Sequence, residues 1–346
     1  RSTGWGLLPA GHLEDNQDWK QWFAVNAHAY AGMSATAEVL NEIDHVEAPR
    51  LGREALGYVA DIRCAVQRAM VEAPVVRLRD GTFIPRIPPR VGLRGRERGW
   101  FREVTYGAIQ LLEGHVLPAD DPRVTWILKD IEDNLMVSRE WGFPVDVEKD
   151  WFSRGGVAPQ PNVFDLAVDY LRREQPEHAL RVFFNTWAAS VYPDVLCFAE
   201  WIPAFGEGGG PFFKTPDEAR WVSWLRALLV LDDEHSLRVG SGIPRYWLAD
   251  GKTVAFERLA TRFGAAACTW TSSLSNGYID VLYHPPDRQP PGQTTLYVRQ
   301  PGRALATGVE CSTHDVRMVD CRETSLALDQ PTGSVSLRVH FDSVSK

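Results

Sequence analysis

The sequence lacks the features that identify zinc-binding, disulfide-rich, membrane-spanning and nucleic-acid-binding proteins. Its five cysteines are odd in number and show neither C-x-x-C nor Cys/His ligand spacing, which argues against a zinc site or a disulfide framework. No apolar run approaches about 18 residues, so no transmembrane helix is predicted. With a formal net charge of −8 and no basic cluster, the chain offers nucleic acid no phosphate-binding face. We therefore expect reduced thiols, no metal or other cofactor, and neither nucleic acid nor a membrane as partner.

The chain begins RSTGWGLLP, with neither an initiator methionine nor a signal-peptide pattern, and this start predicts a piece of a longer precursor or a trimmed chain. What the chain does have is size: 346 residues with 44% hydrophobic content predict two domains. Its 13 tryptophans are the one compositional excess. Most of them belong in the core, but sugar-binding clefts also favour flat aromatic faces, on which pyranose C–H faces stack.

Apolar residues at helical spacing predict three helical hairpins and a seventh helix in the first two thirds of the chain. The expected helices cover about 18–41, 47–72, 100–113, 121–136, 163–172 and 176–190, and the seventh begins at Thr215. Asp121 before a proline is a helix start, and Thr215 with Glu218 three residues later is a capping box. The pattern predicts a helical-hairpin (α/α) domain over residues 1–235.

Long segments rich in Gly, Pro and Trp come before each helical pair and before the seventh helix, at about 1–17, 73–99, 137–162 and 191–215. A pair of antiparallel helices returns the chain to the end where it began. The four segments are therefore expected at one end of the helical array, lining one cavity, and functional residues are expected on them.

The pattern changes from about Ser236. Alternating segments such as YIDVLYH, TTLYVRQ and SVSLRVHF are separated by turn sequences such as SNG and QPTG. Alternation of this kind predicts antiparallel strands. We expect residues 236–346 to form a separate, antiparallel β-sandwich-like domain.

Three carboxylates on these segments are candidates for acid–base chemistry. In CFAEWIPAFGEGGGPFF, Glu200 has aromatic neighbours, which would partly desolvate its carboxylate and perturb its pKa, as acid–base work requires. The glycines after it would let the backbone approach a ligand closely. In the first segment, Asp18 is expected to cap the first helix. Glu14 and Asp15 cannot both cap a helix, so one of them is free for chemistry.

Further side chains on the same segments are typical of sugar binding, since they combine aromatic, amide, carboxylate and guanidinium groups. The arginines around Arg102 could pair with a carboxylated substrate. The full set of predicted substrate-binding residues is Trp5, His12, Trp100, Arg102, Asp150, Trp151, Arg154, Gln160, Asn162, Trp201 and Glu207.

Three motifs resemble the (α/α)6-toroid "six-hairpin" glycosidases, which include trehalase-like and glucosidase-like hydrolases. The motifs are AEWIPAFGEGGG, the GLLP at Gly6–Pro9, and GIPRYWLADGKTVAFERLATRFG after the seventh helix. The resemblance implies a toroidal catalytic domain, a C-terminal β-domain and Glu200 as catalytic base. Seven predicted helices are too few for a complete toroid. A partner chain or an N-terminal segment could supply the rest.

This resemblance implies a glycoside hydrolase, and inverting enzymes need an acid and a base on either side of the scissile bond. We expect Glu200 as base and Asp15 as acid, with Glu14 as the reserve acid. A polysaccharide lyase acting on a uronate-containing glycan is the alternative, since NAHAY supplies Asn26, His28 and Tyr30. His28, however, lies about 200° from Asn26 around a helix. A sugar-binding protein without catalysis is the third hypothesis.

Overall fold

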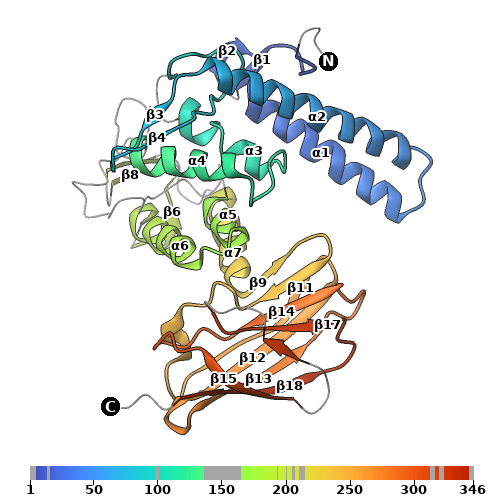
Figure 1. The fold of residues 1–346 in the computed structure, drawn as a ribbon, viewed down its shortest axis with the longest axis vertical. Helices are drawn as coiled ribbons and strands as arrows, with labels where there is room; N and C mark the ends of the chain where they lie inside the picture. The colour runs from blue at the N-terminus through green and yellow to red at the C-terminus, as the bar shows by residue number, and fades with distance from the viewer. Residues whose placement is uncertain are drawn as a thin grey trace. The chain divides into compact units, whose positions relative to one another are not determined.

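The computed structural model describes residues 5–13, 16–97, 101–135, 165–192, 194–199, 201–204, 207–209, 215–311, 316–318 and 323–342 (Figure 1). The chain forms two compact units. The first consists of Arg1–Asp169 and Arg181–Trp221, and the second of Tyr170–Leu180 and Val222–Lys346. The expected division between residues 235 and 236 stays a prediction. The coarse prediction, helices followed by antiparallel sheets, is confirmed.

Helices α1 (Phe23–Glu42) and α2 (Ala48–Glu72) form the first predicted hairpin (Figure 1). The apolar residues of α2 recur at helical spacing, and Ala55, Val59 and Ile62 are buried along one face. A short turn joins the two helices, so they run antiparallel, as their spacing in the sequence predicts.

The first helix begins later than predicted, because residues before it pair as strands β1 (Gly11–Leu13) and β2 (Asn16–Lys20). The N-cap of α1 is Trp22, and no side chain caps it. The expected role of Asp18 as helix cap is therefore wrong. Asp18 lies in β2, and its Oδ2 is 2.7 Å from Nη2 of Arg102. An ion pair with a residue far along the chain replaces the local cap.

The second predicted pair is more broken than expected. It contains α3 (Gln110–Glu113) and α4 (Pro122–Asp130), and π-helical turns occupy Phe101–Thr105 and Ile131–Leu135. A Cβ at Gly107 would lie 1.9 Å from the Glu103 carbonyl oxygen, so the chain passes itself there too closely for a regular helix with a side chain. The helix start at Asp121 is confirmed, since its Oδ1 accepts the Arg123 N–H at 2.8 Å.

The remaining helices are α5 (Leu166–Arg172), α6 (Pro176–Ser190) and α7 (Thr215–Leu229), close to their predicted bounds. Short hairpins join strands β3 (Val76–Arg77) to β4 (Phe83–Ile84), β5 (Val191–Tyr192) to β6 (Cys197–Phe198), and β7 (Trp201–Ala204) to β8 (Glu207–Gly209). Part of the glycine-rich run is thus strand β8. Glu218 does not close the predicted capping box, because its Oε1 accepts the Phe198 N–H at 3.0 Å.

A buried ion cluster holds the segment between α2 and α3. Arg86 Nη2 lies 2.7 Å from Glu103 Oε1, and the two side chains are only 1% and 3% exposed. Arg96 lies 3.3 Å from Glu103 Oε2 and donates two hydrogen bonds to Asp130, at 2.6 and 3.1 Å. Desolvation opposes the charge of Arg96, but its carboxylate partners outweigh this and raise its pKa. These ion pairs therefore stabilise the folded segment.

The second unit is a sandwich of two five-stranded sheets, β16-β17-β14-β10-β9 and β11-β12-β13-β18-β15. The strands are β9 (Val230–Asp232), β10 (Ser236–Val239), β11 (Thr253–Thr261), β12 (Gly264–Ser273), β13 (Tyr278–His284), β14 (Gln293–Tyr297), β15 (Ala306–Cys311), β16 (Arg317–Met318), β17 (Ser325–Asp329) and β18 (Val335–Phe341). Short 3₁₀ turns occupy Arg245–Leu248 and Leu274–Asn276. The pairing is antiparallel except between β10 and β14, which run parallel.

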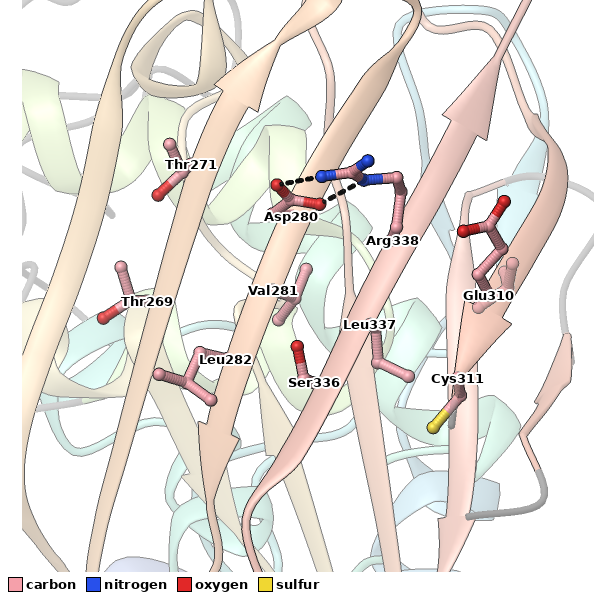
Figure 2. A pocket seen from close by; sticks show the side chains of 11 residues that line it. Thr269, Thr271, Asp280, Val281, Leu282, Glu310, Cys311, Ser336, Leu337 and Arg338 are labelled. Atoms are coloured by element: carbon pink, nitrogen blue, oxygen red, sulfur yellow. Dashed lines mark hydrogen bonds and ion pairs between the residues drawn. The ribbon is translucent and has the colours of Figure 1, made fainter. Parts of the chain in front are cut away.

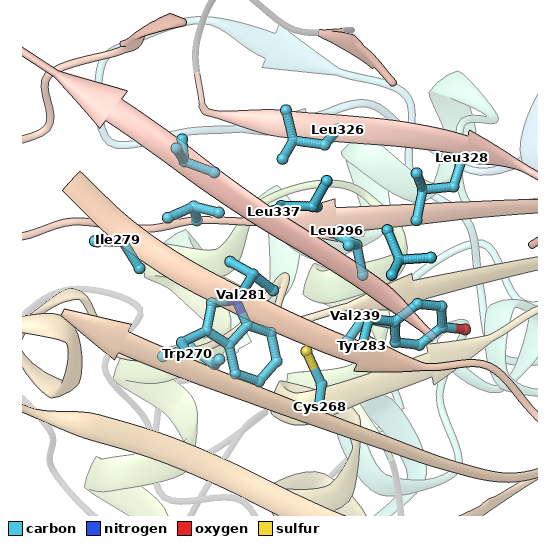
Figure 3. Packing of buried hydrophobic residues seen from close by; sticks show 14 of the residues in the cluster. Val239, Cys268, Trp270, Ile279, Val281, Tyr283, Leu296, Leu326, Leu328 and Leu337 are labelled. Atoms are coloured by element: carbon cyan, nitrogen blue, oxygen red, sulfur yellow. The ribbon is translucent and has the colours of Figure 1, made fainter. Parts of the chain in front are cut away.

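Alternation along the strands separates two faces of the second sheet. Thr271, Asp280 and Arg338 point outward (Figure 2), while Trp270 and Val281 point into the sandwich (Figure 3). Side chains from both sheets meet there in one apolar cluster. Burial of this kind is the main favourable term in folding.

Three polar groups are enclosed in this core. The Trp270 indole is fully buried and donates to the Tyr297 carbonyl at 3.1 Å. Cys268, 1% exposed, packs nearby (Figure 3), and burial raises the pKa of its thiol well above the ordinary value. Burial also raises the pKa of Tyr283 to about 12. All three side chains are therefore uncharged at neutral pH and pack as part of the apolar core.

Candidate functional site

The GLLP segment is anchored on helices α1 and α2. Gly6 has φ +69°, and a Cβ there would lie 2.5 Å from Cγ of Asp61 on α2. The Leu8 N–H donates to Asn26 Oδ1 on α1 at 2.9 Å. The guanidinium of Arg68 lies 5.6 Å from the ring centroid of Trp5, within cation–π range. The predicted sugar-binding Trp5 therefore has a protein partner on one face of its ring.

Two other predicted binding residues lie on or beside the β1–β2 hairpin. The ring of His12 meets that of Trp19 edge to face, with centroids 4.3 Å apart, and Trp19 is 63% exposed. Arg102 is paired with Asp18, with Nε 2.8 Å from Oδ2. Arg102 is thus engaged in an ion pair within the chain.

The remaining predicted site residues lie outside the described residues or have no described side chain. Outside are Glu14, Asp15, Trp100, Asp150, Trp151, Arg154, Gln160, Asn162 and Glu200. The backbones of Trp201 and Glu207 lie in the paired strands β7 and β8, where Trp201 is opposite Gly209. The catalytic assignment of Glu200, Asp15 and Glu14 stays a prediction.

An aromatic cluster, which we call the α6–α7 cluster, consists of Phe183, Trp187, Phe198 and Trp221. Trp221 of α7 stacks on Phe183 of α6, with ring centroids 4.4 Å apart and an interplanar angle of 22°, and its ring lies 4.5 Å from that of Trp187. Phe198 meets Trp187 edge to face at 5.8 Å. Trp187 is 38% exposed, so part of this aromatic surface remains open to a ligand.

Polar atoms on the same two helices are buried without a hydrogen-bond partner among the residues described. They are Thr186 Oγ1 and Ser190 Oγ on α6, and Glu218 Oε2 and Trp221 Nε1 on α7. Burying such a group unpaired costs about 1–3 kcal/mol, so native proteins normally pair it with water or a ligand.

The segment leading to Glu200 is fixed against this cluster. Ala199 N–H donates to the Ser190 carbonyl at 2.7 Å, and Phe198 N–H donates to Glu218. Strand β6 also pairs with β5, so that Phe198 lies opposite Val191. The backbone before the predicted base is therefore held by α6 and α7 rather than by the glycines that follow.

A second group of carboxylates gathers around Glu113 at the end of α3. Glu113 Oε1 accepts the Asp165 N–H, and Asp165 pairs with Arg220 of α7. Burial first, and then the charges of Asp169 and Asp165, raise the pKa of Glu113 well above its ordinary value. A carboxyl group in this environment keeps its proton to higher pH than an ordinary glutamate.

Sequence reasoning missed both groups. Trp187 follows Phe183 by four residues on a predicted helix, so the aromatic face of α6 could have been read from the sequence. Glu113, Asp165 and Asp169 gave no local signal, because the three are brought together only by the packing of α3 beside the start of α5.

Two contacts tie the second long segment to neighbouring elements. Phe23 N–H donates to the Pro89 carbonyl at 2.9 Å, which joins the start of α1 to this segment. Arg79 N–H donates to Asp133 Oδ2 at 3.0 Å, which joins the same segment to the π-helical turn Ile131–Leu135. Whether the four segments line one cavity stays a prediction.

Two further properties concern the described part of the chain. No helix there is both long and apolar enough to cross a membrane. No cluster of His, Cys, Asp and Glu side chains in that part could hold a metal ion.

The sequence matches no protein-family model and no curated protein. Solved structures similar to it include two α-L-rhamnosidases. One is Streptomyces avermitilis α-L-rhamnosidase complexed with L-rhamnose. The similarity covers 97% of this chain and 29% of that protein, with 13% identity and a TM-score of 0.47. The similarity to α-L-rhamnosidase from Dictyoglumus thermophilum covers 90% of this chain and 31% of the other, with 10% identity and a TM-score of 0.43. The chain thus spans less than a third of either protein. Both are glycoside hydrolases, and the trehalase-like or glucosidase-like assignment stays a prediction.

Proposed function

We propose that the protein is a glycoside hydrolase whose site lies where the α6–α7 cluster meets the segment that carries Glu200. The observation behind this proposal is the arrangement of Trp187, which is 38% exposed and lies beside Trp221, itself stacked on Phe183. Exposed aromatic faces bind the apolar face of a sugar ring.

In this proposal Glu200 is the base that activates water, and Asp15 is the acid that protonates the leaving group, with Glu14 in reserve. An inverting mechanism requires carboxyl groups about 6.5–9.5 Å apart, with room for a water between the base and the sugar. Trp201 and Glu207 would line the same cleft. The helical hairpins would belong to an (α/α)6-toroid, completed by a preceding segment or a partner chain.

The lyase alternative is disfavoured by the contacts of Asn26. This residue is 1% exposed, and its amide donates to the Trp22 carbonyl at 2.6 Å. Its Oδ1 accepts from Leu8 N–H and from the Tyr58 hydroxyl at 2.6 Å. An amide that is buried and engaged on both sides is not available to neutralise a uronate.

The test is hydrolysis of a panel of aryl glycosides and oligosaccharides, including an α-L-rhamnoside, by the full chain and its variants. Glu200→Gln and Asp15→Asn are expected to lose about 10²-fold or more in turnover with the fold retained. Glu54→Gln, on the exposed face of α2, is the control and should keep full activity. Azide should rescue Glu200→Ala better than Asp15→Ala, because a small anion can take the place of the attacking water.

Trp187→Ala should raise KM about fivefold, which corresponds to roughly 1 kcal/mol of stacking. Full activity of Glu200→Gln ends the catalytic assignment. Ultraviolet absorbance of an unsaturated product would identify a lyase instead, and binding without any product would leave a sugar-binding protein.

A further inference from the structure

The outward face of the sheet β11-β12-β13-β18-β15 is hollowed into a groove of about 770 Å³ (Figure 2). Ligand sites in proteins usually have volumes of about 300–1,000 Å³, so this groove is large enough for an oligosaccharide. The groove belongs entirely to the second unit, whereas the α6–α7 cluster belongs to the first.

Strand register lines up charged and hydroxyl side chains in one row across the groove. Thr271 of β12 lies opposite Asp280 of β13. Asp280 in turn lies opposite Arg338 of β18, which lies opposite Glu310 of β15. Arg338 donates to both carboxylate oxygens of Asp280, at 2.7 and 3.0 Å, as the dashed lines in Figure 2 show. Because neighbouring strands lie about 4.8 Å apart, this row of polar groups extends over roughly 14 Å.

The neighbouring row carries smaller side chains and forms the floor of the groove. Thr269 lies opposite Leu282, and Leu282 lies opposite Ser336. Leu282 is 42% exposed, although it stands in the middle of the sheet. An exposed aliphatic group beside a row of carboxylate, guanidinium and hydroxyl groups fits a pyranose, which has an apolar C–H face and a rim of hydroxyls.

A third row fixes the polar side chains from the other side. Arg338 lies over the ring of Tyr278, with Cζ 4.0 Å from the centroid. Nε2 of His340 lies 3.0 Å from Glu310 Oε1, and His340 is opposite Tyr278 in the register. These contacts hold Arg338 and Glu310 in position before a ligand arrives. Preorganised groups reduce the entropy lost on binding.

The charge of the groove decides the class of ligand. Asp280 and Glu310 are acidic, and the one guanidinium, Arg338, is already paired with Asp280. A uronate would meet this excess of negative charge on a chain whose net charge is −8. Neutral hydroxyls can instead donate to the carboxylates and accept from the guanidinium. We infer that the groove binds a neutral oligosaccharide, at a site additional to the hydrolytic one proposed above.

The experiment is isothermal titration calorimetry of the full chain with cellohexaose, xylohexaose, mannohexaose and maltohexaose, and with hexagalacturonate as the acidic probe. Ser336→Tyr fills the floor while leaving the ion pair, and tyrosine suits an exposed strand position. Ser275→Tyr makes the same change at an exposed serine outside the groove and serves as control. Asp280→Asn keeps the shape and weakens the polar row, in case Ser336→Tyr fails to fold.

At least one neutral hexasaccharide should bind the wild type and Ser275→Tyr equally. Ser336→Tyr should bind it at least tenfold more weakly, and Asp280→Asn should also bind it more weakly. The inference is overturned if no neutral probe binds, if hexagalacturonate binds better, or if Ser336→Tyr binds as the control does. Self-association of the wild type that Ser336→Tyr abolishes would assign the face to a second copy of the chain and also overturn it.

Turnover separates this inference from the proposed hydrolase. Aryl glycoside hydrolysis is followed in the same variants, and Ser336→Tyr is expected to keep it while losing oligosaccharide binding. A chain that hydrolyses nothing but binds a neutral hexasaccharide through Ser336 refutes the hydrolase proposal and supports the groove.

Discussion

Replacing Glu103 by alanine should destabilise the first unit strongly, because it removes the centre of a buried ion cluster. The Glu103 carboxylate lies 2.7 Å from Arg86 Nη2 and 3.3 Å from Arg96 Nη1, and it accepts the Glu97 N–H at 2.7 Å. With both Arg86 and Glu103 at most 3% exposed, water cannot replace the lost partner. After the substitution Arg86 keeps, among the contacts of the described residues, its hydrogen bond to the Gly95 carbonyl, at 2.6 Å.

Breaking a buried ion pair by removing one partner costs about 3–5 kcal/mol, most of it from the charge left behind. For a unit of this size, 1 kcal/mol corresponds to about 2–4 °C, so Tm should fall by roughly 6–20 °C. Arg96 retains its two hydrogen bonds to Asp130, and this limits the loss.

Thermal and urea unfolding followed by far-ultraviolet circular dichroism measure this change, since the first unit contains most of the helix. Glu54→Ala is the matched control, because its pair with Arg50 at 2.8 Å has both side chains about half exposed. Exposed pairs contribute little, so this variant should unfold close to the wild type. The double variant Arg86→Met/Glu103→Leu should recover part of the loss, since Arg86 is no longer left as a buried charge without its partner and Arg96 stays paired with Asp130. If Glu103→Ala melts within about 2 °C of Glu54→Ala, the argument from burial is wrong.

Two further predictions concern stability. Glu113 binds its proton more tightly in the folded than in the unfolded chain, so its favourable contribution is lost as pH rises from the ordinary glutamate pKa through the raised folded-state pKa. The Tm of Glu113→Gln relative to wild type should therefore increase across that pH window, and a difference that is constant with pH would contradict the assignment. Gly6→Ala should destabilise by about 1–2 kcal/mol or more in urea unfolding, because φ +69° and the contact with Asp61 both disfavour a Cβ. Gly11→Ala, with no atom nearer than 4.0 Å to the added Cβ, should be nearly neutral, and equal effects of the two would refute the reasoning.

Local pattern predicted the long helices well and the short elements poorly. The hairpin of α1 and α2 follows from apolar residues at helical spacing, because only a helix places residues with this spacing on one face that can be buried. The pairing of β1 with β2 was missed, because residues before α1 look like a polar loop until a partner strand is placed beside them. The predicted helix over 100–113 failed at Gly107, where the chain approaches its own backbone.

The α6–α7 cluster was missed, because only some of its members lie close together in the sequence. The position of Phe198 and Trp201 beside Glu200 could be read directly, but the stacking of Trp221 on α6 depends on helix packing. The glycines after Glu200 were expected to let the backbone approach a ligand, and Gly209 pairs with Trp201 in a hairpin. The row of polar side chains on the β-sandwich could not be predicted without the strand order. β18 lies between β13 and β15, and the sequence alone does not show that these strands are neighbours.

The reactivity of the buried Cys268 thiol can be used to measure how often the β-sandwich of the second unit opens. Its thiol is enclosed between the sheets and has a raised pKa, so the reactive thiolate is scarce and shielded while the sandwich is closed. Cys64, by contrast, is exposed on α2. A thiol reagent should modify Cys64 at once and Cys268 only when the sheets separate. Because Cys197 is also buried, the slow phase is followed at Cys268 itself by peptide mass spectrometry. Its rate would then give the rate and free energy of that opening under native conditions, without denaturant and without an introduced probe.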